Sequence, residues 1–183
     1  MRRQQKARIE TGLILRIPEA EPLVGDLRRR HDPNAAEGVP AHVTVLYPFR
    51  PLGRIGTVTL AALARMFAET APFDLSFAGT GRFPGVCWLR PEPSEALDRL
   101  GRAAAATFPD CRPYGGRFGD PIAHLTVAMS EDEALLDRIE ADLRGRLTAP
   151  VRARIAHCSL FAHLPDGWRE ERAFPLAGPL AGL

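Results

Sequence analysis

The sequence contains two copies of one short pattern, a His-x-Thr set in a run of β-branched and apolar residues, and this duplication limits the possible folds. The copies are residues 41–47 (AHVTVLY) and 123–129 (AHLTVAM). Such runs favour strands, and a strand directs residues i and i+2 to the same side. Each His is therefore expected beside its own Thr. The opposite face is expected to meet the core through Val43, Val45, Leu125 and Val127.

The elements around the two copies also repeat in order. In each half we predict a strand, a helix that begins at a Pro-Glu pair (Pro18 and Pro91), the motif strand, a second helix and a further strand. The second helices are expected at residues 58–70 and after the capping-box pattern at 130–133. The closing strands of the two units are expected at 73–78 and 151–161, and one more strand near 169–176 ends the chain. The periodicity thus predicts two β-α-β-α-β units.

The composition is that of an ordinary globular chain of one domain or two small lobes: 183 residues, 45% hydrophobic and 25% charged. A net charge of +2 gives no case for bulk nucleic-acid binding, although a local basic groove remains compatible with it. Three scattered Cys without a C-x-x-C pair argue against a disulfide framework and a zinc ribbon. No stretch has the pattern of a signal peptide or the length of a membrane span, so we expect a cytoplasmic protein with no membrane contact.

The paired motif, with Pro40 and Pro48-Phe49 beside the first copy, resembles the 2H phosphoesterase superfamily, and in particular its 2′-5′ RNA ligase-like and RNA 2′,3′-cyclic phosphodiesterase members. The resemblance extends over about residues 11–176. It implies an α+β, bilobed, pseudo-two-fold fold with mostly antiparallel sheets, helices outside and a central groove. We expect one domain over residues 1–183, with lobe one at about 11–83, lobe two at about 84–183 and a flexible basic tail at 1–10.

The same resemblance implies that His42 and His124 face each other across the groove. Two imidazoles that titrate near neutral pH can share acid–base work, one accepting a proton from water and the other protonating the leaving oxygen. The hydroxyls of Thr44 and Thr126, two positions along each strand, can donate hydrogen bonds to phosphate oxygens. This chemistry requires no metal and no other cofactor.

The predicted function is a metal-independent phosphodiesterase that acts on a 2′,3′-cyclic phosphate or a 2′-5′ linkage. Its expected partner is an RNA end, an oligonucleotide or a nucleotide, with no obligate protein partner and a monomeric state. Two alternatives remain open, a non-catalytic RNA- or nucleotide-binding module and a hydrolase of a small non-RNA cyclic phosphate.

Further substrate contacts are expected from two places. The loop before the second motif carries Arg112, Tyr114, Arg117 and Phe118, which can stack a base and pair with a phosphate if the loop folds over the groove. Arg152 and Arg154 have groove-facing parity in their strand, and either hold phosphate or form a solvated arginine ladder.

The remaining histidines and Tyr47 have structural interpretations. His31 suits a helix end, His157 shares parity with core residues, and His163 falls near a strand end without zinc-ligand spacing. Tyr47 lies on the core parity of its strand. Many 2′-5′ RNA ligase-like proteins have a basic residue shortly after the second motif, where this chain has residues 128–130 (AMS).

Overall fold

The computed structural model describes residues 9–116 and 122–178, which form two antiparallel sheets of four strands each. The first sheet has the order β2-β1-β7-β8, with bounds Thr11–Arg16 (β1), His42–Leu46 (β2), His157–Leu164 (β7) and Gly167–Pro175 (β8). The second has the order β5-β4-β3-β6, with bounds Phe73–Phe83 (β3), Val86–Glu92 (β4), Leu125–Met129 (β5) and Val151–Ile155 (β6). Every strand pair is antiparallel. The expected α+β class with antiparallel sheets is confirmed.

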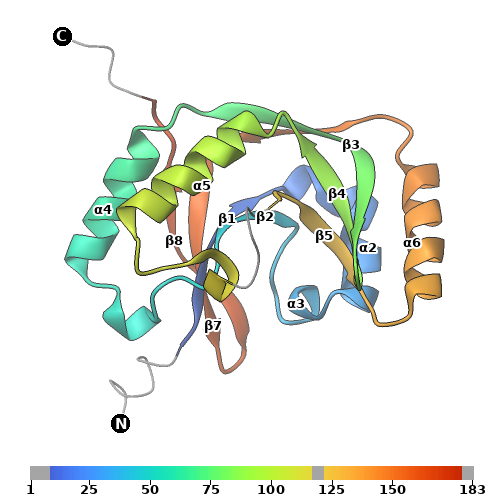
Figure 1. Cartoon of the computed structure of the whole chain (residues 1–183), viewed down its shortest axis with the longest axis horizontal. Coiled ribbons are helices and arrows are strands. Elements are labelled where there is room, and N and C mark those ends of the chain that lie inside the picture. The colour runs from blue at the N-terminus through green and yellow to red at the C-terminus, as the bar shows by residue number, and fades with distance from the viewer. Residues whose placement is uncertain (1–8, 117–121, 179–183) are drawn as a thin grey trace.

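Helices lie on the outside of the two sheets (Figure 1). The α-helices are α2 (Glu21–His31), α3 (Pro33–Ala36), α4 (Thr57–Ala68), α5 (Glu95–Thr107) and α6 (Glu133–Arg146). Short 3₁₀ helices occur at Pro18–Ala20 (η1), Leu52–Arg54 (η2) and Pro113–Gly116 (η3). In Figure 1, α4 and α5 lie to one side of the molecule and α2 and α6 to the other. None of the helices in the described ranges is both long and apolar enough to cross a membrane.

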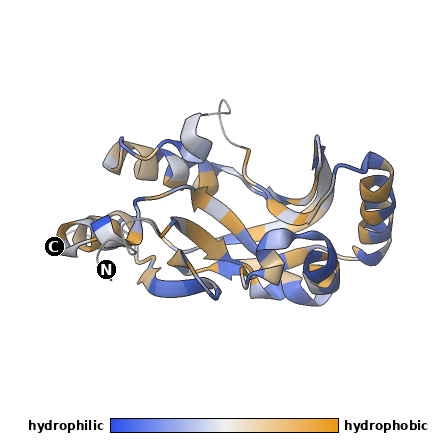
Figure 2. Ribbon diagram, turned by 90° about the horizontal axis from the view of Figure 1, so that it is seen from below, coloured by the Kyte–Doolittle hydropathy of each residue, from blue (hydrophilic) through white to orange (hydrophobic). Residues whose placement is uncertain are grey.

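The alternation of the two motif strands produces the predicted division of faces. Val43, Leu125 and Val127 are completely buried, and Val45 packs against the same core from a partly buried position. This core extends through both sheets and their covering helices, and hydrophobic segments gather on the central strands in Figure 2. The apolar face of each motif therefore anchors the strand whose other face carries His and Thr.

The sheets do not follow the predicted division of the chain near residue 83. Strand β3, expected in the first lobe, pairs with β4 and β6 of the second sheet. Strands β7 and β8, expected in the second lobe, join β1 of the first sheet. One sheet is thus built from the two ends of the chain and the other from residues 73–155. The β3–β4 hairpin is local and closes at Gly85, whose positive φ of 77° suits a tight turn, and this close pairing places β3 beside β4.

Two element boundaries also differ from expectation. Pro91 and Glu92 continue strand β4, so α5 begins only at Glu95. The expected strand at 151–161 is two strands, because the chain leaves the second sheet after Ile155 and enters the first at His157. The parity assigned to His157 is lost at this crossing, and its side chain is exposed instead of buried in the core.

Candidate active site

The two motifs meet in one cavity of about 660 Å³ between the sheets. Strands β2 and β5 are the edge strands of their sheets and contact each other, which brings the motifs together. His42 and Thr44 line the cavity from β2, while His124, directly before β5, and Thr126 line it from the other side. The structure therefore assembles, in one place, two imidazoles and two hydroxyls that lie far apart in sequence.

Both histidines are held in the same way. Nδ1 of His42 lies 2.8 Å from the carbonyl oxygen of Pro40, and Nδ1 of His124 lies 2.7 Å from the carbonyl oxygen of Ile122. A carbonyl oxygen only accepts hydrogen bonds, so each Nδ1 carries the proton and donates. In the neutral ring this leaves Nε2 unprotonated, and Nε2 is then the atom that can accept a proton from a reacting group.

The environment favours the neutral form of both rings. The pKa of His42 is lowered to about 4, chiefly by burial and also by the positive charge of Arg28, while the hydrogen bond to Pro40 and the charge of Asp32 oppose this shift. Burial also lowers the pKa of His124, opposed by its hydrogen bond to Ile122. The two imidazoles therefore have different surroundings, with a cation beside His42.

A buried ion pair that was not predicted lies beneath the motifs. Arg28 is 2% exposed; its Nη2 donates to Oδ2 of Asp32 at 2.8 Å, and its Nε donates to the carbonyl oxygen of Thr126 at 3.1 Å. Asp32 also caps α3 by accepting from the backbone N–H of Asn34. Arg28 thus joins α2 to β5 and fixes the second motif relative to the first. In the sequence, the burial of Arg28 is indicated by its position on the inward face of α2 with Val24 and Leu27, and its ion pair is indicated by Asp32 four residues later.

Aromatic side chains form much of the cavity wall on both sides. Phe83 contacts His124 edge-on at 5.1 Å between ring centroids and stacks on Trp88 at 5.0 Å. On the opposite wall Tyr47 meets the ring of Trp168 at 6.0 Å. These rings give the site apolar walls on which a nucleobase can stack.

The prediction that Tyr47 belongs to the core is wrong, because β2 ends at Leu46 and the strand alternation does not continue to residue 47. Its ring lines the cavity and its hydroxyl donates to Oε2 of Glu10 at 2.7 Å. Burial, together with that carboxylate, raises the pKa of Tyr47 to about 12. Tyr47 is therefore a protonated, anchored part of the wall.

The loop before the second motif contributes one of its predicted residues to this cavity. Tyr114 lines it and is hydrogen-bonded to Thr44, an interaction that opposes the rise in the pKa of Tyr114 caused by burial. Its backbone N–H donates to the carbonyl oxygen of Tyr47 at 2.6 Å. Arg112 lines a different cavity. Arg117 and Phe118 fall outside the described residues.

The expectation that Arg152 and Arg154 face the groove is not met. Both are exposed on β6, which is the opposite edge of the second sheet from β5, and neither lines the cavity. Arg154 forms an ion pair with Asp74 at 2.9 Å. The alternation of residues along β6 indicates which side chains share a face of the strand, but it does not indicate where the strand lies within the sheet.

The charge of the cavity is unusual for a phosphate site. Among the described residues that line it, none is Lys or Arg, and Asp32 is its one acidic residue. The described part of the chain also contains no group of three or more His, Cys, Asp or Glu arranged to hold a metal ion. Apart from the Asp32 carboxylate, the main hydrogen-bonding side chains that line the described part of the cavity are therefore imidazoles, hydroxyls and the amide of Asn34.

Comparisons with known proteins agree with this arrangement. A family model described as the 2′-5′ RNA ligase superfamily matches residues 17–167. No curated protein sequence matches significantly.

Among solved structures, TT0787 of Thermus thermophilus is similar at 20% identity and a TM-score of 0.63, covering 93% of this chain and 100% of that one. Escherichia coli LigT complexed with 3′-AMP is similar at 15% identity and a TM-score of 0.59, covering 92% and 98%. LigT complexed with ATP gives 16% identity and a TM-score of 0.57, with the same coverage. At these identities the likeness establishes the fold.

Proposed function

Because the chain belongs to the 2′-5′ RNA ligase superfamily of 2H phosphoesterases, we propose that it is a metal-independent phosphodiesterase acting on a 2′,3′-cyclic phosphate or a 2′-5′ linkage of RNA or nucleotides. One observation carries the proposal. His42, Thr44, His124 and Thr126 line a single cavity, and each His is oriented by a backbone carbonyl so that Nε2 remains for proton transfer. A site that only bound nucleotides would not need two imidazoles prepared in this way.

In the proposed reaction on a cyclic phosphate, His42 is the general base and His124 the general acid. Neutral His42 accepts a proton from water as the water oxygen attacks phosphorus. Protonated His124 gives a proton to the ring oxygen as its bond to phosphorus breaks. Burial and the charge of Arg28 favour the neutral form of His42, which supports its role as the base. Proton exchange with solvent then restores both rings.

The threonine hydroxyls are proposed to hold the non-bridging phosphate oxygens. Both line the cavity two residues after their His, so a phosphate held by Thr44 and Thr126 lies between the imidazoles. A hydroxyl donor in a partly buried site gains strength as negative charge develops on those oxygens. Tyr114, which is hydrogen-bonded to Thr44, adds a phenol beside this position.

A nucleotide ligand is supported by the size and lining of the cavity, with about 660 Å³ between aromatic walls. The similar LigT structures, complexed with 3′-AMP and with ATP, support the same class of ligand. The resemblance to RNA cyclic phosphodiesterases implies that the 3′ oxygen leaves and that the product is a 2′-phosphate.

The test is incubation of an oligonucleotide ending in a 2′,3′-cyclic phosphate, with separation of the isomeric products. A 2′-phosphate is expected. A 3′-phosphate would mean that the ribose lies the other way. An unreacted end would exclude RNA cyclic phosphates, and turnover of a 2′-5′ linkage or a small cyclic phosphate would then identify the alternative substrate. Binding without turnover of any of these would contradict the enzymatic proposal.

A further inference from the structure

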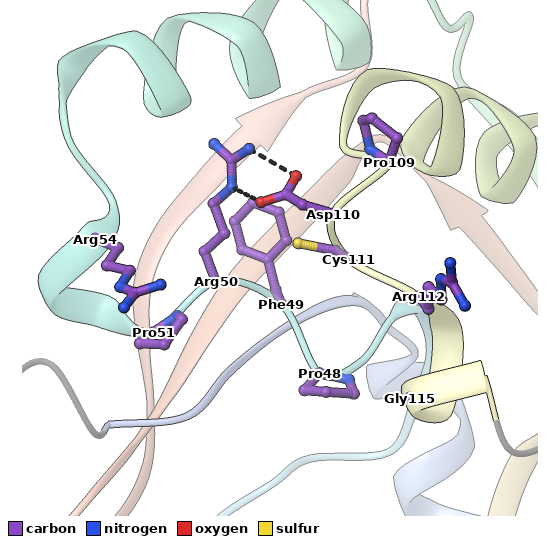
Figure 3. Close-up of a pocket in the computed structure, with 10 residues that line it drawn as sticks. All are labelled: Pro48, Phe49, Arg50, Pro51, Arg54, Pro109, Asp110, Cys111, Arg112 and Gly115. Atoms are coloured by element: carbon purple, nitrogen blue, oxygen red, sulfur yellow. Dashed lines mark hydrogen bonds and ion pairs between the residues drawn. The ribbon is translucent and has the colours of Figure 1, made fainter.

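A second cavity, of about 790 Å³, lies behind the wall of the catalytic one (Figure 3). It is bounded by the segment after β2, which includes Pro48 and Arg54, and by the segment after α5, which includes Asp110 and Gly115. The two cavities share their partition. Tyr47 and Tyr114 face the catalytic cavity, while their chain neighbours Pro48 and Gly115 line the second one. The Tyr114–Tyr47 backbone hydrogen bond joins the two segments of this partition.

One arginine of the second cavity has a structural role. Arg50 makes two hydrogen bonds to Asp110, Nε to Oδ2 at 2.9 Å and Nη2 to Oδ1 at 2.7 Å, and a third from Nη1 to Oγ1 of Thr59 at 3.1 Å. Its guanidinium also lies 5.2 Å from the ring centroid of Phe108. These contacts hold the two bounding segments together, and Asp110 balances the charge of Arg50.

Two further arginines are not balanced in this way. Arg54 and Arg112 lie on opposite sides of the cavity in Figure 3, and both are exposed. Neither forms an ion pair with a carboxylate anywhere in residues 9–116 or 122–178. The cavity therefore has an excess of positive charge, contributed by two exposed guanidinium groups at opposite sides, with the Arg50–Asp110 pair between them. Such groups match the geometry of phosphate oxygens better than other side chains do.

The second cavity thus has arginine side chains, which are absent from the described lining of the neighbouring catalytic cavity. No Lys or Arg occurs among the described residues that line the catalytic cavity, and residues 128–130 after the second motif (AMS) include no basic side chain. Among the described residues, a mononucleotide in the catalytic cavity would meet no Lys or Arg side chain. A longer strand, by contrast, carries further backbone phosphates beyond its reacting end.

We propose that the second cavity binds an internal phosphodiester of a single-stranded oligonucleotide whose reacting end occupies the catalytic cavity, with Arg54 and Arg112 paired to the phosphate oxygens. The proposal rests on the proposed function and specifies its substrate as an oligonucleotide end in preference to a free nucleotide. Arg50 and Asp110 act only to fix the walls.

The experiment compares three ligands with three proteins. The ligands are a mononucleotide 2′,3′-cyclic phosphate, a trinucleotide with the same end, and that trinucleotide with uncharged methylphosphonate internal linkages. The proteins are the wild type, Arg54→Gln/Arg112→Gln, and the control Arg65→Gln/Arg138→Gln. The control removes the same charge from exposed positions outside both cavities.

For the wild type we expect kcat/KM to be about tenfold or more higher for the charged trinucleotide than for the mononucleotide. Either the Arg54→Gln/Arg112→Gln substitutions or the methylphosphonate linkages should reduce that kcat/KM ratio to about one. Combining the two changes should lower kcat/KM for the trinucleotide little further, as expected for coupled partners. The control variant should keep the ratio. In trinucleotide binding measured by fluorescence anisotropy, the slope of log K against log salt should become shallower by about 0.7 in the cavity variant, the effect of one phosphate on a single strand.

A wild-type ratio near one would overturn the proposal, as would an equal loss in the cavity and control variants or an unchanged salt slope. Failure of the proposed function looks different. In that case the wild type would hydrolyse neither mononucleotide nor trinucleotide, while the anisotropy comparison would still decide whether Arg54 and Arg112 bind a backbone phosphate.

Discussion

The pH dependence of kcat/KM gives the most direct test of the two-imidazole mechanism. The profile is expected to be a bell displaced to acidic pH, since burial lowers the pKa of both His42 and His124 from the ordinary 6.5. The base must be neutral, so activity is lost as pH falls through the His42 pKa of about 4. The acid must be protonated, so activity is lost as pH rises through the His124 pKa, which lies below 6.5.

The magnitude follows from these limits. An acid with a pKa no higher than 6.5 is at most about one-tenth protonated at pH 7.5, so kcat/KM there should be no more than about a tenth of its maximum. It should then fall about tenfold for each further pH unit. On the acidic side the same tenfold slope is expected below pH 4.

The assay is kcat/KM for a cyclic phosphate substrate from pH 3.5 to 9 at constant ionic strength, which reports the groups of the free enzyme. The residual activity of His42→Asn should lose the acidic limb and keep the alkaline one, and His124→Asn should do the reverse. A maximum at or above pH 7.5 would refute the argument from burial. Limbs that disappear in the opposite variants would exchange the roles of acid and base.

Three other outcomes are expected. His42→Ala and His124→Ala should each lower kcat about 10²-fold or more, and the double variant should lose much less than the two single losses multiplied together. EDTA should leave kcat unchanged, and turnover that EDTA abolishes would contradict the two-His mechanism. Arg28→Met, which leaves Asp32 buried without its partner, should lower the free energy of unfolding in urea by about 3–5 kcal/mol, whereas a loss below 1 kcal/mol would show that the pair does not hold α2 to Thr126. Between pH 6.5 and about 4, His42 binds more protons in the unfolded chain than in the folded one, so thermal stability should decline as pH falls. The decline should be at most about 3 kcal/mol for a fully buried ring, and less in proportion to the exposure of the ring. The His42→Asn variant should show a smaller decline.

The faces of the two motif strands could be predicted from the sequence because their signal is local. Strand alternation places Thr44 beside His42 and sends Val43 inward whatever the rest of the chain does, and the second motif repeats this at Leu125 and Thr126. The burial of Arg28 is indicated by its helical position four residues before Asp32, but its hydrogen bond to the Thr126 carbonyl oxygen joins distant segments that no local pattern connects.

Two of the errors, at His157 and Tyr47, share one cause, which is counting parity past the end of a strand. His157 and Tyr47 were assigned to the core from strands that end before them, at Ile155 and Leu46. The partition of the sheets is a different case. Strands β3 and β7 each pair with the next strand in a local hairpin, but the pairing of β3 with β6 and of β7 with β1 joins distant segments, and no local pattern of residues encodes it.

The way the chain divides between its sheets sets an order for folding during synthesis. The second sheet uses only residues 73–155, so all its strands have been made before β7 leaves the ribosome. The first sheet must wait, because the central strand β1 pairs on one side with β7, as in the Leu13–Leu160 pair across almost the whole chain. A nascent chain therefore contains every strand of the second sheet while β1 has only β2 to pair with. The groove becomes a site only when the last strands return to the beginning of the chain.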